Sequence, residues 1–457
     1  MARRKSHSYG SVRGYIPYAV LIVFLVIISV LARAFFDRYP HVTEEIDFQL
    51  LVLGGLLFIG FYINRIAPKT IIPSFVWAIF AGLALQPLLS VFTGDIGALS
   101  VTMEIFAAII LFSGGLEIPF KNFKKWFFPI ASLSLIGVMA SSVLFAVLLY
   151  GLVSMFGTFD PIIIPSIIIL SAALASSDPT AIIPTLKNIH FKKPALKQIV
   201  IAESALTDVT GSVLTRFLLL ALITVDLTAQ HGVLSYFTPL LQKSTYDALA
   251  LQIISGILVG FAGYLVIKRF YRGSKSESSG SDPALMISVP IVTFVVGNIL
   301  GGAGLLAAFV SGLLSDVVGG IKKASHFYDS FLNHLIKPVI FIALGALVPI
   351  DVLLALAPLG IISALVFMFI VRPFVVFVSL LPWFHKNVFG FRDFLFLSFI
   401  RETGIIAAVM IIIAAASPII VPDFIIAIGM WIILLTLIIE PPLTPYFAKK
   451  IGVLREK

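Results

Sequence analysis

The chain contains no cysteine, which excludes disulfides, thiolate nucleophiles and zinc sites built on thiolates. It is also poor in charge, since Asp, Glu, Lys and Arg make up 12% of its residues, against about 25% in an ordinary soluble domain. What it has instead is apolar surface, because 59% of the residues are hydrophobic and the mean hydropathy is +1.08. No soluble core hides that much apolar surface. The composition therefore excludes a secreted enzyme and a nucleic-acid-binding protein, and it predicts a polytopic membrane protein.

The apolar stretches are about 20 residues long, the length of a membrane-spanning helix, and do not alternate in strand-length pieces. We therefore predict an all-α polytopic membrane protein with thirteen or fourteen transmembrane helices. The expected spans lie near residues 15–36, 48–64, 71–92, 99–117, 127–156, 161–187, 198–225, 247–268, 284–301, 303–318, 332–350, 354–381, 393–417 and 420–440.

The distribution of basic residues predicts the orientation. Of the 32 Lys and Arg residues, 25 fall in segments that this span count places in the cytoplasm, three fall on the opposite side and four lie inside spans. Such an excess is typical of cytoplasmic loops, so both termini are expected in the cytoplasm and the protein is expected to cross the cell (plasma) membrane many times. The net charge of +9 fits loops that face anionic lipid rather than nucleic acid. We expect a single integral membrane domain over residues 1–457, transmembrane over about 15–440, without a sizeable soluble domain.

Ionisable side chains inside membrane spans are costly and usually functional. The acidic and basic residues of this kind are Glu104, Asp178, Glu203, Asp208, Glu402, Arg216, Arg372 and Arg401. Lys337 and Glu440 lie near expected helix ends, where they are expected to snorkel toward water. At 1.5 Å per residue, Asp208 lies about 15 Å from the cytoplasmic end of its span, and Asp178 and Arg372 lie about 13 Å from theirs. Two carboxylates and one guanidinium are therefore predicted near the membrane midplane.

Two spans carry candidate breaks. In the sixth, residues 176–180 read SSDPT, and the proline removes a backbone donor and disfavours helix in the residue before it. In the thirteenth, residues 401–404 read RETG. Breaks at mid-membrane expose carbonyl oxygens and helix ends, which suits a small cation. The two breaks are seven spans apart, and an odd offset means opposite orientation, so the sequence predicts an inverted repeat.

The seventh span contains the segment 203–208, ESALTD. Glu203 and Asp208 are separated by about 140° around a helix and therefore face different directions. The long side chain of Arg372 is expected to reach Glu203, and a buried pair of this kind is tolerable where a lone charge is not. We assign a structural role to the Glu203–Arg372 pair and the chemical role to Asp208.

These motifs together resemble the monovalent cation/proton antiporter superfamily, most closely its NhaP/NHE-type branch. The segments that carry the resemblance are 111–117 (LFSGGLE), 177–181 (SDPTA), 203–208 (ESALTD) and 371–373 (VRP). Their order and their positions within the spans agree, and the resemblance extends over about residues 48–440.

The resemblance implies an NhaA-like antiporter fold with two crossed broken helices, a dimerisation domain and a core domain around residues 99–225 and 332–417. It also implies a homodimer that needs no cofactor beyond the transported Na⁺, Li⁺ or K⁺ and H⁺. In such a protein Asp208 binds either the cation or the proton. The residues that assist it are Asp178, Ser177, Ser204 and Thr207. Glu203 favours the electroneutral branch of the family.

Four features depart from the family pattern. Thr207 stands where electroneutral members have Asn and electrogenic members have Asp, which leaves the stoichiometry open. Ser177 replaces the usual Thr. Glu402 stands where the family usually has a small residue, and it either forms an inert pair with Arg401 or adds a second titratable group. The span at 15–36 is also one more than the thirteen that this branch has.

Two alternative functions remain at this stage. An organic-anion/sodium symporter of the same architecture also has broken helices, but it does not need Asp208 flanked by a Glu–Arg pair. An intramembrane aspartyl protease would use Asp178 and Asp208, but the G-x-G-D context of such enzymes is absent. We therefore expect a transporter rather than an enzyme, with its partners being monovalent cations, protons and the lipid bilayer. The choice between Na⁺ and K⁺ stays open.

Overall fold

The computed structural model describes residues 14–39, 46–66, 70, 72–157, 161–177, 186, 190–223, 243–271, 283–318, 328, 330–384, 389–400 and 402–455. The regular elements in these ranges are helices, apart from one isolated β-bridge between Phe191 and Leu454.

The first half of the chain forms α1 (Ile16–Arg38), α2 (Ile46–Ile66), α3 (Ser74–Ala84), α4 (Gln86–Thr93), α5 (Ile96–Glu117), α6 (Phe120–Lys125), α7 (Phe127–Ala131), α8 (Gly137–Met155), α9 (Ile164–Ala173) and α11 (Pro194–Ile223). The second half forms α12 (Lys243–Tyr271), α13 (Pro283–Ile299), α14 (Gly304–Ser315), α16 (Lys337–Leu347), α17 (Ile350–Ala355), α18 (Ala357–Val366), α19 (Arg372–Phe384), α20 (Phe391–Phe399), α21 (Ile405–Ala415) and α22 (Pro422–Ile451). Short π-helical segments lie at Ser132–Ile136, Leu332–Ile336 and Phe367–Val371, and a 3₁₀ turn at Pro161–Ile163.

The predicted all-helical membrane fold is confirmed. Among the described residues, eight helices or helix runs are long and apolar enough to cross a membrane, and six shorter apolar helices account for the other predicted spans. The third predicted span is divided, because the chain bends at Leu85 between α3 and α4. Membrane-facing helices such as α1 and α12 expose large apolar side chains, as lipid contact requires.

The order of elements repeats between the two halves. α5 and α16 are both followed by an apolar C-cap residue and a proline, at 118–119 and 348–349. In each half there follow short helices, a π-helical segment, a long helix and a broken span, and then a helix of 30 residues, α11 or α22. This correspondence supports the predicted repeat at an offset of seven spans. The predicted crossing of the two broken helices involves residues 178–185 and 187–189, which lie outside the described residues.

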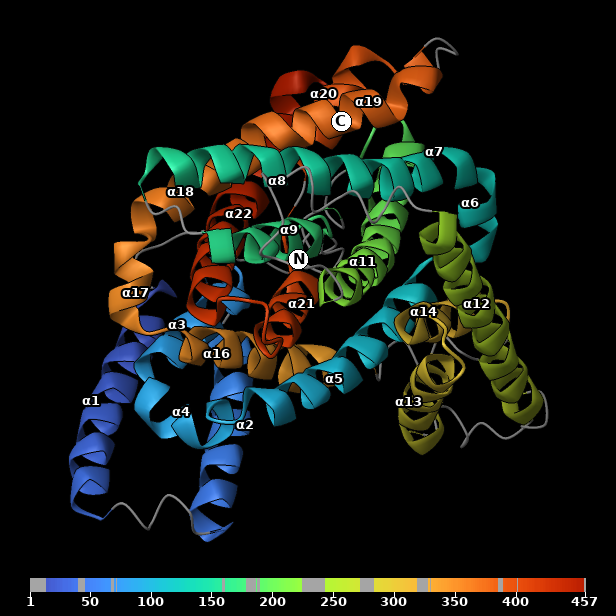
Figure 1. Ribbon diagram of the computed structural model, residues 1–457. Coiled ribbons are helices and arrows are strands. Elements are labelled where there is room, and N and C mark those ends of the chain that lie inside the picture. Colours follow the sequence, from blue (N-terminus) through green and yellow to red (C-terminus); the bar gives the residue numbers. More distant parts are fainter. Residues whose placement is uncertain are drawn as a thin grey trace, which may run out of the picture.

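The helices form two groups, which Figure 1 shows in the upper and lower parts of the molecule. We call α8, α9, α11 and α18–α22 the core group, and α1–α5, α12–α14 and α16 the scaffold group. This grouping differs from the expected core ranges 99–225 and 332–417 in that it leaves out α5 and α16. Within the scaffold group, α5 packs on α14 and α3 packs on α16. α5 and α16 also contact α21, so they lie along the boundary between the groups.

Glycines bring the scaffold helices into close contact. A Cβ on Gly115 or Gly312 would overlap a backbone carbonyl oxygen across the α5–α14 contact, and one on Gly82 or Gly345 would do the same across the α3–α16 contact. Since α3 corresponds to α14 and α5 to α16 at the seven-span offset, the same seam occurs twice. Small residues at these seams let the helix backbones approach closely, as is typical of membrane helix packing.

Candidate functional site

The helix α11 carries most of the candidate site. It runs from residue 194 to 223, so Asp208 is the fifteenth of its 30 residues and lies at its middle. The side chains of Glu203, Ser204, Thr207 and Asp208 are all buried, and Asp208 is 5% exposed. Every polar group on this stretch must therefore find its partners inside the protein.

The end of α9 meets α11 through hydroxyl groups. α9 ends at Ala173, and the chain leaves helical geometry before Ser177. The Ser204 hydroxyl donates to the Ser177 carbonyl at 3.0 Å, and the Ser177 and Thr207 hydroxyls are 2.9 Å apart. The Ser177 N–H also donates to the Thr207 hydroxyl at 3.3 Å. Side chains of α11 thus take the place of the helical hydrogen bonds that the break removes from Ser177.

A glycine allows this approach. A Cβ on Gly211 would lie 3.2 Å from the Cβ of Ser176 and 3.4 Å from its backbone nitrogen. The chain at the break therefore lies directly on α11 one turn beyond Asp208. Any larger residue at 211 would separate the two segments and weaken the hydroxyl contacts.

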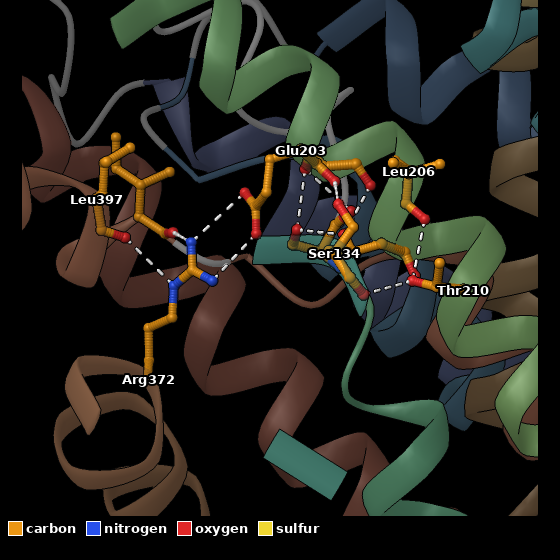
Figure 2. A network of polar contacts seen from close by, with 10 residues as sticks. Ser134, Glu203, Leu206, Thr210, Arg372 and Leu397 are labelled. Carbon is orange, nitrogen blue, oxygen red and sulfur yellow. Dashed lines mark hydrogen bonds and ion pairs between the residues drawn. The ribbon is translucent and has the colours of Figure 1, made fainter. Parts of the chain in front are cut away.

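The predicted partners Glu203 and Arg372 are brought together. Nη1 of Arg372 donates to Oε1 of Glu203 at 3.1 Å, and Nη2 donates to Oε2 at 3.5 Å (Figure 2). Both side chains are about 3–4% exposed. The pairing of a guanidinium fork with both carboxylate oxygens is the geometry that makes a buried ion pair favourable.

Arg372 also reaches the second break. Its Nε donates to the carbonyl of Leu397 at 3.2 Å, as Figure 2 shows, and its Nη2 donates to the carbonyl of Ile400 at 3.1 Å. These carbonyls lie at the carboxyl end of α20, where helical partners are missing and the helix dipole favours a cation. One arginine therefore satisfies the break in the thirteenth span and fixes it to α11 through Glu203.

One π-helical segment contacts α11, and another directly precedes Arg372. Ser134, in the segment Ser132–Ile136, accepts a hydrogen bond on its carbonyl from the Thr210 hydroxyl at 2.9 Å (Figure 2). Arg372 directly follows the segment Phe367–Val371. Single π-helical turns are frequent at functional sites because they widen the helix and re-aim the residues beside it.

The second break has a hydroxyl bridge of its own. The hydroxyls of Thr403, at the break, and Thr436, on α22, are 2.5 Å apart. The position of this pair corresponds to that of Ser177 and Thr207 in the first half, since both break residues lie four positions after the preceding helix. Glu402, beside this bridge, is fully buried.

Two further expectations need correction, and two fall outside the described residues. Lys337 and Glu440 are each 2% exposed and do not snorkel. Lys337 donates to Oδ1 of Asn333 at 2.8 Å, and Glu440 lies inside α22, which continues to Ile451. Asp178 and Arg401 lie outside the described residues.

Two cavities open beside α11, one toward each end. A cavity of about 480 Å³ is bordered at the amino end of the helix by Lys197, Gln198 and Ala202. A second of about 360 Å³ is bordered toward its carboxyl end by Val213 and Arg216. Asp208 lies between these stretches of α11, and residues from both scaffold and core helices line each cavity.

An ion pair at the second cavity was not predicted. Nη2 of Arg216 donates to Oε1 of Glu104 on α5. Both residues stand out in the sequence as charges inside spans, but they were not matched with each other. The signal was their depth, because Glu104 is eight residues after the start of α5 and Arg216 seven before the end of α11. Both residues therefore lie about 11 Å from the same predicted side of the membrane.

The donor set of the site consists of hard oxygens. Hydroxyls of Ser177, Ser204 and Thr207 and the Ser177 carbonyl gather on the stretch of α11 that carries Asp208. Such oxygens suit a dehydrated alkali-metal ion rather than a transition metal. Among the residues that the structure describes, no group of three or more His, Asp or Glu side chains is placed to hold a metal ion.

Comparisons with known proteins converge on one family. Residues 52–450 match the family model described as the transmembrane sodium/hydrogen exchanger. The chain is 27% identical over 387 residues to the K(+)/H(+) antiporter NhaP of Alkalimonas amylolytica, covering 80% of this chain and 60% of that protein. It is 24% identical over 251 residues to the Na(+)/H(+) antiporter ApNhaP of Aphanothece halophytica, covering 53% of this chain and 44% of that protein. The chain thus spans about half the length of the curated relatives it matches.

The fold matches that of a solved antiporter. The structure at pH 8 of the sodium proton antiporter MjNhaP1 from Methanocaldococcus jannaschii superposes on this chain with a TM-score of 0.71 at 20% sequence identity. The match covers 88% of this chain and 98% of that one. At this identity the likeness establishes a shared fold.

Proposed function

The chain belongs to the sodium/hydrogen exchanger family, and from that premise we propose that it exchanges a monovalent cation for protons by alternating access. The cation is Na⁺ or Li⁺, with K⁺ the alternative, because both Na(+)/H(+) and K(+)/H(+) antiporters are among its relatives. Neither the organic-anion symporter nor the intramembrane protease finds support among those relatives.

The observation that carries the proposal is the buried cluster on α11. Asp208 lies at mid-helix, 5% exposed, on the same stretch as Ser204 and Thr207, which contact the broken end of α9 at Ser177. We propose that Asp208 holds either the proton or the cation, with these hydroxyl and carbonyl oxygens and Asp178 as further ligands. One site that binds two ions in competition gives exchange once access alternates between the two sides.

The cost of an empty carboxylate enforces the coupling. A bare charge carried through a low-dielectric region is unfavourable, so the helix that carries Asp208 moves only when a proton or cation neutralises it. This penalty prevents leak without a further coupling device. Because Arg372 already compensates Glu203, that pair adds no net charge, and we propose an electroneutral one-for-one exchange.

We further propose that the Glu203–Arg372 pair is structural. It connects α11 to the carboxyl end of α20 and so fixes one break relative to the helix that carries the ion site. Arg401 and Glu402 remain secondary candidates, either as an inert pair or with Glu402 as a second titratable group.

The cellular setting is proposed from the sequence. The excess of basic residues in alternate loops supports a multi-pass protein of the plasma membrane with both termini in the cytoplasm. On this orientation the cavity at the amino end of α11 faces the cytoplasm. A homodimer without a resident cofactor follows from the family.

Ion exchange in proteoliposomes tests the proposal. A trapped pH dye reports proton movement on addition of Na⁺, Li⁺ or K⁺, with the voltage clamped at zero and then at a set value. We expect a response to one of these cations that does not change with voltage. Silence with every cation would overturn the antiporter assignment, and a voltage-dependent rate would overturn electroneutrality.

A further inference from the structure

Arg216 joins the helix of the ion site to the scaffold group. It lies on α11 eight residues, or about 12 Å, beyond Asp208. Its guanidinium donates to Glu104 on α5 and, at 3.4 Å, to Oδ1 of Asn298 on α13. Its Cζ lies 5.6 Å from the ring centre of Phe294, also on α13. All three contacts cross the boundary between the core and scaffold groups.

The pair lies in the wall of the second cavity. The side chains of Arg216 and Glu104 are 27% and 25% exposed, so the pair is partly shielded and stronger than a fully solvated one. The scaffold residues that line this cavity have hydrogen bonds of their own. The Gly304 N–H donates to Oδ1 of Asn298 at 3.2 Å, and the Ala303 N–H donates to the Gln252 carbonyl at 3.0 Å.

The route from this cavity to Asp208 is closed in the structure. Ser212, one helical turn from Asp208 toward the cavity, is fully buried, and its hydroxyl donates to the Val209 carbonyl of its own helix at 2.8 Å. Access from this side requires α11 to shift relative to α5 and α13. Since the contacts of Arg216 span that boundary, they resist the shift.

We propose that the Glu104–Arg216 pair is the gate between the second cavity and Asp208. It holds α11 against α5 and α13 while Asp208 is closed to this cavity, and it separates when access switches to this side. The role of a gate rests on the proposed function. Whether the pair holds the cavity closed is a question of conformation, which is measured without any transport assay.

The absence of native cysteine allows a direct test. Ser212→Cys places one thiol behind the gate, and a membrane-impermeant maleimide is added from the side of the second cavity in purified vesicles. With the pair intact we expect slow labelling. Glu104→Gln and Arg216→Gln each remove one charge and are expected to raise the labelling rate about fivefold or more, the size of a typical conformational coupling.

Charge exchange and matched controls separate the gate from general loosening. The double variant Glu104→Arg with Arg216→Glu restores a pair and is expected to return the labelling rate toward that of the intact pair. Asp247→Asn on α12 and Arg33→Gln on α1 each remove one charge, negative or positive, from an exposed position. Both are expected to leave the labelling rate unchanged.

Two results would overturn the inference: equal labelling rates with and without the pair, or accelerated labelling that charge exchange does not reverse. If Arg216→Gln fails to fold, Glu104→Asp, which keeps the charge but shortens the arm, is expected to accelerate labelling in the same direction. A failure of cation/proton exchange in the wild-type chain would overturn the proposed function and leave this labelling result standing.

Discussion

Asp208 is the residue on which the proposed exchange depends. Asp208 lies at the middle of a 30-residue helix and is 5% exposed, on the same stretch of α11 as the hydroxyls of Ser204 and Thr207. A group in this position gains most from binding a cation or a proton, because each removes a charge from a poorly solvated place.

Asp208→Asn is expected to abolish cation-driven proton movement while the protein still folds. The amide is close in shape but neither titrates nor neutralises a cation. Proton flux in proteoliposomes measures the activity, and a thermal melt in detergent checks the fold. Asp247→Asn, at an exposed position on α12, is the matched control and is expected to keep wild-type flux. Retained exchange in the Asp208 variant would exclude it as the shared site.

The Glu203–Arg372 pair contributes to stability rather than to ion binding. Removing one partner leaves the other buried and uncompensated, which costs about 3–5 kcal/mol. Glu203→Ala and Arg372→Ala are therefore each expected to lower the melting temperature strongly. Arg33→Gln on α1 is the control, because it removes a charge from an exposed position and is expected to leave the melting temperature nearly unchanged.

A second comparison tests the same pair without relying on one variant. Replacing both Glu203 and Arg372 by methionine removes the charges together and is expected to destabilise less than either single replacement. Melting temperatures of single and double variants that simply add would show that the two residues are not coupled.

At the scale of elements, α11 connects the two broken spans. Ser204 and Thr207 contact the end of the first break at Ser177, and Glu203 reaches the second through Arg372. Breaks are costly inside a membrane because they leave backbone groups without partners. Here side chains of one helix, directly or through the arginine, supply partners to both.

Ser204→Ala is expected to raise the cation concentration needed for half-maximal exchange several-fold. The change removes the hydrogen bond to the Ser177 carbonyl and one hydroxyl near the proposed site. Ser171→Ala on α9 is the control, since that buried hydroxyl bonds to Ile167 of its own helix at 2.7 Å. Equal effects of the two changes would mean that the contact at the break has no special role.

The glycine seams of the scaffold make a separate prediction. Gly345→Ala places a methyl group against the Ile79 carbonyl and is expected to lower the melting temperature, because α16 and α3 must separate. Gly55→Ala on α2 meets no atom within 4 Å. It is expected to leave the melting temperature equal or slightly higher, since alanine is the better helix former. A thermal melt of both variants decides the comparison.

At the scale of the whole molecule, the spans and the fold class were predictable, because apolar length alone marks a membrane helix. The element repeat was indicated by the positions of the two breaks. Glu203 and Arg372 were also matched from the sequence, since the long arginine side chain can reach the glutamate and neither charge tolerates isolation.

Other features depended on packing that a sequence does not contain. The bonds from Arg372 to the carbonyls of Leu397 and Ile400 require the end of α20 to lie beside α19. The last span was expected to end near Glu440, but α22 continues to Ile451 through three prolines, since tertiary contacts override the local preference. Burial of Lys337 similarly reflects neighbouring helices rather than its own position in the chain.

One cavity lies toward each end of α11, and Asp208 lies between them. If the cation and the proton compete for Asp208, both cavities lead to the same site and no separate proton path is needed. The whole exchange cycle depends on this competition.

The dependence of the apparent KM for the cation on pH measures this competition. Proteoliposomes of the wild-type chain are assayed at zero voltage with the preferred cation over a series of pH values, and initial rates give KM and the maximal rate separately. Competition for one site predicts that, on the acid side, KM rises about tenfold for each unit fall in pH, since each unit is a tenfold change in the competing proton, while the maximal rate at saturating cation changes little. An apparent KM that stays constant while the maximal rate falls would mean that protons act at a different group, and would exclude competition at Asp208.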